Sequence, residues 1–306
     1  MIKTILLTGG TGLVGNKLVE MLISRGYKIN LLIRREPKFA KAGVKTFKYD
    51  VYKHQIDKEC IIGVDAIIHL AGEDIGSRRW TDERKQQIRE SRTESIRMIY
   101  DLLRKTKNQV GHVISASAVG YYGNRGDEIL VEESLPAKDF LAETCIQWEQ
   151  AVDEGNQFGL RIVKLRTGLI LDSKKGALVE MSKPLKMGLG TILGSGNQWI
   201  SWIHIKDVVN MYIFALENED MRGPYNMAAP NPVSNEVMTH AIAKAMNRSV
   251  WFVHVPAFTL KLAMGEMSKL VLGSTRVSPD KIIRSGFKFA YPKLEEALNE
   301  IYQTNT

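Results

Sequence analysis

Three glycines close to the start of the chain, Gly9, Gly12 and Gly15, have the spacing of a turn that binds phosphate groups. They follow a short apolar run at residues 3–8 and precede residues 16–23, whose apolar positions recur at helical spacing. Gly9 would allow the tight turn, Gly12 would let the backbone approach a pyrophosphate, and Gly15 would let the helix pack closely on its strand. A glycine-rich turn without a ligand is the alternative, but the flanking strand and helix favour a dinucleotide site. The residues predicted to form it are Thr8, Gly9, Thr11, Gly12, Leu13, Val14 and Gly15.

The end of the second predicted strand, at residues 27–33, bears on which dinucleotide would bind. In sites of this type an acidic residue about 20 positions beyond the glycines usually holds the ribose 2′-hydroxyl of NAD. Arg34 and Arg35 stand at that place instead, and a guanidinium can hold a 2′-phosphate through two hydrogen bonds. The alternative is two solvated arginines at a strand end, and Glu36 lies close enough to leave NAD open. We therefore predict NADP(H) as the cofactor in preference to NAD(H).

Further cofactor contacts are predicted at the ends of three more strands. Asp50 would meet the adenine by a hydrogen bond, and Val51 would meet it by its backbone. The segment that follows the strand at residues 64–70 should pass under the adenosine ribose. These predicted contacts, with those at the end of the strand at residues 111–116, are Leu70, Ala71, Gly72, Ser115 and Ala116.

The elements that must position these residues alternate between short apolar strands and amphipathic helices. This alternation predicts an α/β fold with a doubly wound, parallel Rossmann sheet. Two long helices are expected at residues 82–106 and 139–155. The strands are expected at residues 3–8, 27–33, 44–49, 64–70, 111–116 and 160–165.

Beyond residue 170 the alternation stops, and glycines and prolines mark loops and shorter elements. We predict a cofactor domain at residues 1–170, to which residues 205–228 return. A smaller substrate-side domain would comprise residues 171–204 and 229–306. Its helices are expected at residues 234–246, 257–272 and 293–302. The apolar positions expected to pack the second of these helices against the main domain are 260, 263, 264, 267, 270 and 271.

The composition of the 306 residues is that of a globular protein, with 44% hydrophobic and 25% charged residues. The net charge of +8 fits an anionic small molecule, whereas the absence of a dense Lys/Arg block with aromatic residues argues against nucleic acid. Two cysteines without metal-ligand spacing predict neither disulfides nor a metal site. Without a signal peptide or a long apolar run, we expect a cytoplasmic protein that does not span a membrane. Its oligomeric state stays open.

Several of these segments together resemble the extended short-chain dehydrogenase/reductase superfamily. They are the T-G-x-x-G-x-x-G motif at residues 8–15, Asp50-Val51, the segment from His69 to Gly72 and the serine-containing strand end near 115. More narrowly, the chain resembles an uncharacterised "epimerase family" branch that adds a C-terminal segment of unknown function. The closer match lies in residues 79–81, 85, 88, 91–92, 115–123, 140–143, 148–149, 165–168, 194–204, 223–226, 229–232 and 255–256.

The superfamily implies a catalytic serine, tyrosine and lysine, the last two spaced as Tyr-x-x-x-Lys at the start of a helix. Ser117 matches the serine. When the helix is aligned on Trp148-Glu149, the tyrosine position falls near Leu141 and the lysine position near Cys145. No Tyr-x-x-x-Lys occurs between residues 120 and 170, so the usual proton-transfer pair is missing.

Three side chains are candidates to replace the missing pair. Tyr121 and Tyr122 follow Ser117 on the loop that would face the nicotinamide, although packing in the wall of the site is the alternative. Glu143 lies one turn into the helix, where it could act as a base or simply interact with the helix dipole. Cys145 has no adjacent base and is expected to be a buried cysteine.

Substrate contacts are predicted on two loops, with loop packing as the alternative for their tryptophans. The substrate would be a small molecule, sugar-like or anionic. One function is an NADP-dependent oxidoreductase or epimerase, and the other is a non-catalytic NADP(H)-binding sensor or regulatory protein. The predicted substrate-side residues are Glu73, Arg79, Trp80, Gln198 and Trp199.

Overall fold

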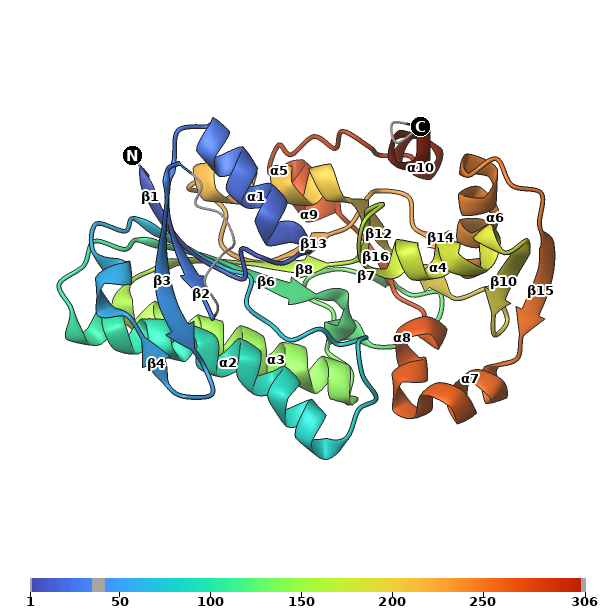
Figure 1. Cartoon of the computed structure of the whole chain (residues 1–306), viewed down its shortest axis with the longest axis horizontal. Helices are drawn as coiled ribbons and strands as arrows, with labels where there is room; N and C mark the ends of the chain where they lie inside the picture. Colours follow the sequence, from blue (N-terminus) through green and yellow to red (C-terminus); the bar gives the residue numbers. More distant parts are fainter. Residues whose placement is uncertain (1, 35–41, 304–306) are drawn as a thin grey trace.

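The structure of the protein is a computed structural model that describes residues 2–34 and 42–303. A single eight-stranded sheet runs through the larger part of the molecule in the order β13-β8-β6-β5-β1-β2-β3-β4 (Figure 1). Every neighbouring pair is parallel except β3 and β4. The strands are β1 (Thr4–Thr8), β2 (Lys28–Ile33), β3 (Val44–Asp50), β4 (Gln55–Ile56), β5 (Ala66–His69), β6 (His112–Ala118), β8 (Arg161–Thr167) and β13 (Gly223–Met227).

Two pairs of helices cover the two faces of this sheet (Figure 1). Helices α1 (Leu13–Ser24) and α5 (Ile205–Glu217) pack on one face, where their apolar side chains share a core with the strands. Helices α2 (Asp82–Lys105) and α3 (Phe140–Asp153) pack on the other face around a second core. The predicted doubly wound α/β sheet is therefore confirmed.

Local sequence explains why these elements form where they do. The central residues of β1 are apolar without alternation, as expected of a parallel strand buried on both faces, and Ile5, Leu6 and Leu7 are fully buried. Helix α2 begins at a Thr81 cap, whose hydroxyl accepts the backbone N–H of Arg84. Five apolar residues that recur at helical spacing along α2 are all buried, namely Ile88, Ile96, Ile99, Leu102 and Leu103.

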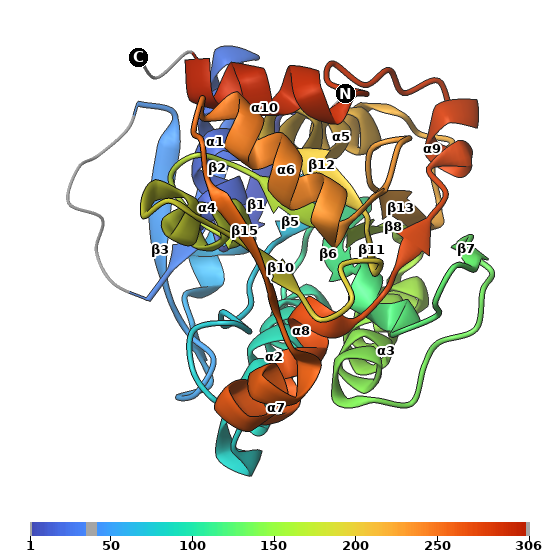
Figure 2. The same cartoon turned by 90° about the vertical axis from the view of Figure 1, so that its right-hand side faces the viewer.

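The C-terminal part of the chain forms a smaller unit beside the carboxyl ends of the main strands, and it faces the viewer in Figure 2. Helices α4, α6 and α10 share a third core with the short strands around them. Its elements are β9 (Leu169–Leu171), α4 (Ala177–Lys186), β10 (Leu189–Leu193), β11 (Trp199–Ile200), β12 (Trp202–His204), β14 (Val233–Ser234), α6 (Asn235–Ala245), β15 (Trp251–Val255), α7 (Ala257–Met264), α8 (Lys269–Leu272) and α10 (Leu294–Gln303). The remaining short elements are β7 (Ile129–Leu130), β16 (Arg276–Val277) and α9 (Asp280–Arg284).

The prediction of a single helix at residues 257–272 was wrong. The chain breaks into α7, a 3-10 turn at residues 265–268, and α8. Gly265 has a φ of +59°, a left-handed conformation that ends the helix and suits glycine. Of the six apolar positions expected to face the main domain, only Met267 is buried, and no residue of α7 is. Phe258 and Leu262 of α7 are 72% and 81% exposed.

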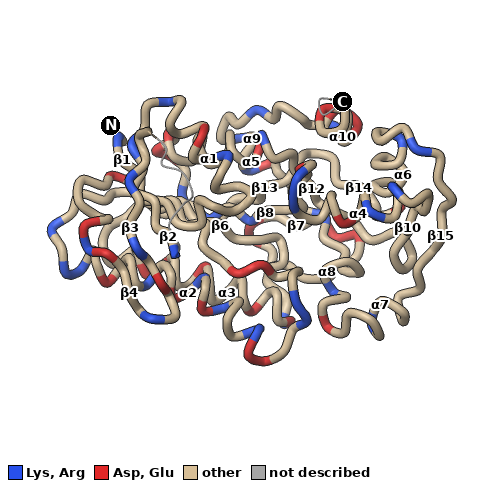
Figure 3. The backbone as a smooth tube through the Cα atoms, in the orientation of Figure 1, with Lys and Arg blue, Asp and Glu red and all other residues tan. Residues whose placement is uncertain are grey.

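Charged residues are distributed over both parts of the molecule, with both signs interspersed along the chain (Figure 3). None of the helices within residues 2–34 and 42–303 is long and apolar enough to span a bilayer. The same described residues contain no cluster of His, Cys, Asp and Glu side chains that could hold a metal ion.

Candidate functional site

The glycine turn lies at the carboxyl end of β1, where the chain passes directly into α1. Gly9 has a φ of +69°, and its carbonyl accepts the N–H of Gly12 at 3.0 Å. A Cβ on Gly15 would lie 2.2 Å from the carbonyl oxygen of Gly9, so the helix can approach the turn this closely only with glycine there. Helix α1 begins without a side-chain cap and without an acidic residue in its first turn. Its N-terminus therefore offers backbone donors and a positive dipole end to an anion.

The turn is joined to the neighbouring strand end at the point where the strand order reverses. The hydroxyl of Thr8 accepts the backbone N–H groups of Leu70 and Ala71, both at 3.0 Å. A Cβ on Gly9 would lie 2.6 Å from the carbonyl oxygen of Leu70, so the two segments are in close contact. Ligands of doubly wound sheets bind outside the carboxyl ends of the strands at such a reversal, here between β1 and β5.

Arg34 follows the last residue of β2 and lies at the same edge of the sheet. Its Nη1 atom is 3.1 Å from Oε1 of Glu73, while Nη1 of Arg84 is 3.2 Å from Oε2. Burial opposes the charge of Glu73, but the hydrogen bonds and charges of Arg84 and Arg34 outweigh it and lower the pKa of this carboxyl. Glu73 was predicted on the substrate side, and the structure places its carboxylate in contact with Arg34. Arg35 lies outside the described residues.

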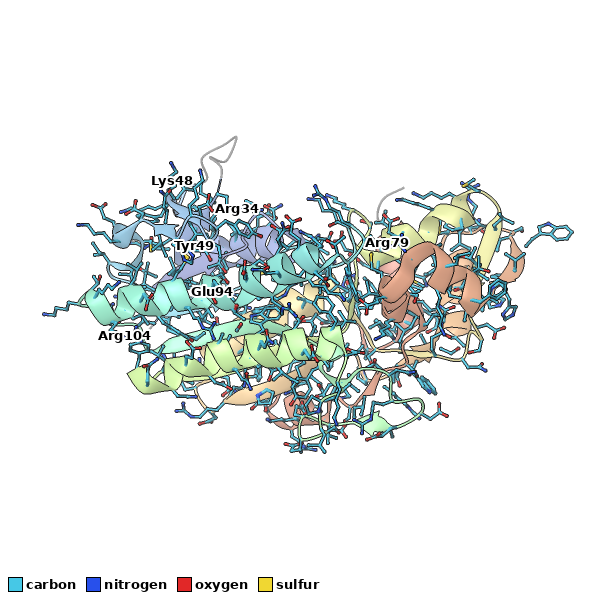
Figure 4. The ribbon with its side chains drawn as sticks, turned by 90° about the horizontal axis from the view of Figure 1, so that it is seen from below. Arg34, Lys48, Tyr49, Arg79, Glu94 and Arg104 are labelled. Carbon is cyan, nitrogen blue, oxygen red and sulfur yellow. The ribbon has the colours of Figure 1, made fainter. Side chains whose placement is uncertain are left out.

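The two predicted adenine contacts are Asp50, the last residue of β3, and Val51, the first residue of the turn that follows. Asp50 Oδ1 accepts the backbone N–H groups of Tyr52 and Lys53 at 3.1 and 3.2 Å, which fixes the turn. A cavity of about 300 Å³ beside this turn extends to α2. Figure 4 labels Arg34, Tyr49 and Glu94, which lie at the same end of the molecule in that view. The residues that line the cavity are Val51, Tyr52, His54, Glu90 and Glu94.

Gly72 lies against a buried guanidinium of α2. A Cβ on Gly72 would lie 3.0 Å from Cζ of Arg92. Arg92 donates to the carbonyl oxygens of Ile88 at 2.8 Å and Glu73 at 3.0 Å, and among the described residues it has no carboxylate partner. Burial lowers the pKa of this guanidinium to about 10, so it stays charged at neutral pH. Arg92 thus fastens the loop that contains the predicted ribose contacts Leu70, Ala71 and Gly72 to helix α2.

His69 and Ser115 form a closed polar cluster under the same loop. The imidazole of His69 is fully buried, with Nδ1 3.1 Å from Ser115 Oγ and Nε2 2.6 Å from Ser95 Oγ. Burial lowers the pKa of His69 to about 3, so the ring is neutral at physiological pH. Ser115 is fully buried as well, whereas its neighbour Ala116 is only partly buried.

Ser117 lies at the carboxyl end of β6 with its hydroxyl turned into the protein. Its Oγ donates to Oε1 of Glu149 at 2.7 Å, and Arg166 binds the same carboxylate through Nε at 2.8 Å and Nη2 at 2.9 Å. Burial opposes the charge of Glu149, but Arg166 and Lys164 lower the pKa of its carboxyl, so Glu149 is ionised. In the sequence, Glu149 and Arg166 belong to segments that match the family, but no role was predicted for either residue.

The two tyrosines after Ser117 are placed differently. Tyr122 is fully buried, and its hydroxyl donates to Asn226 Oδ1 at 2.7 Å and accepts from Arg166 Nη1 at 2.9 Å. Burial raises the pKa of Tyr122 to about 12. Tyr121 is only partly buried, and the guanidinium of Arg166 stacks 3.6 Å from the centre of its ring. Of the two, only Tyr121 is accessible to solvent.

Helix α3 brings Leu141 and Cys145, the residues that the resemblance predicts at the tyrosine and lysine positions, close to Gly120. A Cβ on Gly120 would lie 3.5 Å from Cβ of Leu141 and 3.8 Å from Sγ of Cys145. Burial raises the pKa of the Cys145 thiol to about 12, which suits a structural cysteine. Glu143 is exposed on the first turn of α3.

The predicted substrate-side residues on the loop before α2 have different surroundings. Trp80 is buried, donates through Nε1 to the carbonyl of Ile75 at 2.9 Å and packs edge-on against Phe140. Arg79 is exposed and lies beside Gly265, where a Cβ would be 3.4 Å from Nη2. Figure 4 shows Arg79 between the end of α2 and the C-terminal part.

Of the other two substrate-side predictions, Gln198 joins segments of the C-terminal part and Trp199 joins that part to the loop at Asp127. Gln198 is buried and donates through Nε2 to the carbonyl oxygens of Leu193 at 2.9 Å and Val271 at 3.1 Å. Trp199 donates through Nε1 to Asp127 Oδ1 at 2.7 Å. Arg276 stacks on its indole, with 4.4 Å between Cζ and the ring centre.

The parallel sheet, the glycine turn at its central strand end and the smaller unit over the same edge define the extended short-chain dehydrogenase/reductase class. A family model described as "NAD dependent epimerase/dehydratase family" matches residues 5–228, and the chain belongs to this family. A second model, described as a domain of unknown function, matches residues 255–301. The family predicted from the sequence is thereby confirmed.

Similar proteins extend over nearly the whole chain. The epimerase family protein YfhF of Bacillus subtilis is 37% identical over 298 residues, which cover 97% of each chain. The epimerase family protein SH2119 of Staphylococcus haemolyticus is 35% identical over 304 residues, covering 98% of this chain and 99% of its own.

Two solved structures also match. Human epimerase family protein SDR39U1, solved with NADPH, is 26% identical with a TM-score of 0.85, covering 98% of this chain and 99% of its own. A nucleoside-diphosphate sugar epimerase from Corynebacterium glutamicum is 33% identical with a TM-score of 0.79. That match covers 99% of this chain and 58% of the other.

Proposed function

We propose that this protein binds NADP(H) across the carboxyl ends of β1, β2 and β5. The observation that carries the proposal is the uncapped N-terminus of α1 behind the close contact between Gly15 and Gly9. The pyrophosphate would bind at that helix N-terminus, because free N–H groups and the dipole favour an anion there. The ribose and adenine would lie along Ala71, Gly72 and the cavity beside Val51.

The preference for NADP(H) over NAD(H) is part of this proposal. Arg34 is 57% exposed at the end of β2, so its guanidinium can reach a 2′-phosphate. The solved human relative that contains NADPH supports the same cofactor. Among the described residues, β2 has no carboxylate at its carboxyl end to select a 2′-hydroxyl.

We further propose that the protein is an oxidoreductase or epimerase for a small sugar-like or anionic molecule. A bound nicotinamide would supply or accept a hydride, and the chain would need to move a proton at the substrate oxygen. Tyr121 is the candidate for that proton, because it is partly exposed and lies against the cation of Arg166. Ser117 would help to orient the substrate only if its hydroxyl left Glu149. Glu143, exposed in the first turn of α3, is the alternative acid/base group.

The substrate would bind between the two parts of the molecule. In this proposal residues 1–170 and 205–228 hold the cofactor, while residues 171–204 and 229–306 supply the substrate side. Arg79 is the exposed cation at this boundary, beside Gly265, and could bind an anionic group of the substrate. Gln198 and Trp199 would support that side by fixing the loops that they join.

A non-catalytic NADP(H)-binding protein is the second candidate function. The observation that favours it is the apolar contact of Leu141 and Cys145 with Gly120, where a proton-transfer pair would be expected. The hydrogen bond that the Ser117 hydroxyl donates to Glu149 also favours this function, because it leaves that hydroxyl proton engaged inside the protein. Such a protein would respond to the cofactor without consuming it.

One experiment separates the two. The protein is titrated with NADPH and NADH by nicotinamide fluorescence. It is then incubated with deuterium-labelled NADPH and a panel of carbonyl compounds, and separately with NADP⁺ and a panel of nucleotide sugars whose oxidation or epimerisation is followed by NMR. Label transfer or sugar conversion that Tyr121→Phe abolishes, with NADPH affinity retained, supports the enzyme and the role of Tyr121. Tight NADPH binding without label transfer or sugar conversion for any member of the two panels supports the non-catalytic protein. Failure to bind either dinucleotide contradicts the whole proposal.

A further inference from the structure

Glu73 occupies a fixed place at the adenosine end of the candidate site. Its backbone N–H donates to Ser91 Oγ at 2.9 Å, and its carbonyl accepts from Arg92 Nη2 at 3.0 Å. Both partners belong to α2, so the loop after β5 is fastened to that helix on either side of this one residue. The Glu73 side chain is 22% exposed and directed toward β2.

Its carboxylate is shared between two arginines of different exposure. Arg84 is only 9% exposed, and its other hydrogen bonds include one of 2.7 Å to the carbonyl of Asp74. Arg34 is 57% exposed and meets the same carboxylate from the end of β2. The buried Arg84 therefore fixes the carboxylate, and Arg34 is the partner that a ligand can approach.

This arrangement places two opposing recognition groups in contact. A guanidinium binds the 2′-phosphate of NADP(H), whereas a carboxylate accepts the 2′-hydroxyl of NAD(H) and repels a phosphate. In NAD sites of this fold the carboxylate comes from the end of the second strand. Here that position carries Arg34, and the carboxylate reaches it from the loop after β5.

We propose that Glu73 is a specificity-determining residue that limits how strongly the protein prefers NADPH to NADH. This inference rests on the proposed function, because it assumes that the adenosine ribose lies beside Arg34. A 2′-phosphate at Arg34 must compete with Glu73 for the guanidinium and must tolerate its negative charge. With NADH, the same carboxylate is available to the 2′-hydroxyl. Glu73 therefore weakens the binding of NADPH and strengthens the binding of NADH.

The test is Glu73→Gln, which keeps the side-chain length and an oxygen that can accept from Arg34 but removes the charge. Dissociation constants for NADPH and NADH are measured by nicotinamide fluorescence at fixed salt. We expect NADPH to bind at least about fivefold more tightly and NADH to bind the same or up to about threefold more weakly. The ratio of the NADH dissociation constant to the NADPH dissociation constant, which measures the preference for NADPH, would then increase about tenfold.

A matched control and a double-mutant cycle show whether the effect passes through Arg34. Asp101→Asn removes an exposed carboxylate of α2 that pairs with Arg104 and does not line the cavity beside Val51, so the ratio should stay unchanged. In an Arg34→Gln background, where competition for the guanidinium is absent, Glu73→Gln should still increase the ratio, but by a smaller factor than in the unmodified protein. If Glu73→Gln does not fold by circular dichroism, Glu73→Ala is measured in the same way with the same expectation.

The possible results separate this inference from the proposed function. An unmodified protein that binds neither dinucleotide overturns both. An unmodified protein that binds NADPH in an Arg34-dependent manner, with a ratio that Glu73→Gln leaves unchanged or lowers, overturns only the role of Glu73. A lowered ratio would mean that Glu73 chiefly positions Arg34 for the phosphate.

Discussion

The two ends of the candidate site present their polar groups in opposite ways. At the turn of Gly9, Gly12 and Gly15 the backbone forms the binding surface, and the first N–H groups of α1 have no side-chain cap. Around Ser117, Glu149 and Arg166 the polar side chains bind one another inside the protein. The first end is prepared for a ligand by its geometry, whereas the second has its hydrogen bonds already satisfied. Different residues would therefore serve cofactor binding and proton transfer, and variants at one end can be tested while the other end stays unchanged.

The largest expected effect comes from Gly15→Val at the first end. The new Cβ would lie 2.2 Å from the carbonyl oxygen of Gly9 and 2.6 Å from Cα of Gly10, and neither backbone atom can rotate away. We expect NADPH affinity to fall at least about 100-fold and the free energy of unfolding to fall by about 1–3 kcal/mol. Fluorescence titration and urea unfolding measure the two. Gly111→Ala is the control, because a Cβ there meets no atom within 4 Å. A folded Gly15→Val protein with unchanged affinity would contradict the proposed phosphate site.

The next effect is expected at the second end, with Arg166→Met. This change leaves Glu149 buried without its main cation, which typically costs about 3–5 kcal/mol of unfolding free energy. We expect that loss in urea unfolding at pH 7, with the NADPH dissociation constant changed by less than about threefold in the folded protein. Arg97→Met breaks an exposed pair with Glu154 and should cost less than about 1 kcal/mol. An equally large loss of NADPH affinity in Arg166→Met would show that the two ends are coupled.

A smaller change is expected for Arg34→Asp, which acts only on the choice of dinucleotide. A carboxylate there would repel the 2′-phosphate, so NADPH should bind about 10- to 100-fold more weakly and the preference should narrow or reverse. Competition titrations with NADP⁺ and NAD⁺ measure the ratio. Arg25→Asp provides the control at an exposed arginine that pairs with Glu217. Equal affinities for NADPH and NADH in the unmodified protein would exclude Arg34 as a 2′-phosphate ligand.

The smallest effect is a pH dependence that belongs to the second end. The folded pKa of Glu149 is below its usual value of 4.5, because Arg166 and Lys164 outweigh its burial. Its contribution to stability is therefore present above about pH 4.5 and is lost as the pH falls through the lower folded value. In Arg166→Met the buried carboxyl favours the protonated form instead. The difference in unfolding free energy between the two proteins should shrink from pH 7 to pH 4. A constant difference would mean that Glu149 is not the titrating group.

The sequence predicts the main sheet well because parallel strands buried on both faces read as apolar runs. The helix at residues 82–106 was equally visible, since its apolar positions follow the helical period on a polar background. The prediction of one helix at residues 257–272 was wrong for a physical reason. Periodicity records which residues could share a face, but it does not record that Gly265 adopts a positive φ or that no residue of α7 is fully buried.

The candidate site divides in the same way. The glycine turn was predictable because its spacing reflects contacts between neighbouring residues. The contact between Arg34 and Glu73 was not, because it joins the ends of two separate strands, and Glu73 was predicted on the substrate side. The bond of Ser117 to Glu149 likewise depends on how α3 lies against β6. Long-range polar pairs of this kind leave no periodic signal in the sequence.

The link between β1 and β5 has a thermodynamic consequence. Because the hydroxyl of Thr8 joins the first strand end to Leu70 and Ala71, a dinucleotide at this edge would contact both halves of the sheet and only in the folded chain. Its binding free energy would then add to the stability of the fold, by about 2.7 kcal/mol at a concentration 100 times the dissociation constant. The melting temperature would rise with the logarithm of cofactor concentration. A thermal-shift series could therefore rank cofactors before any substrate is known.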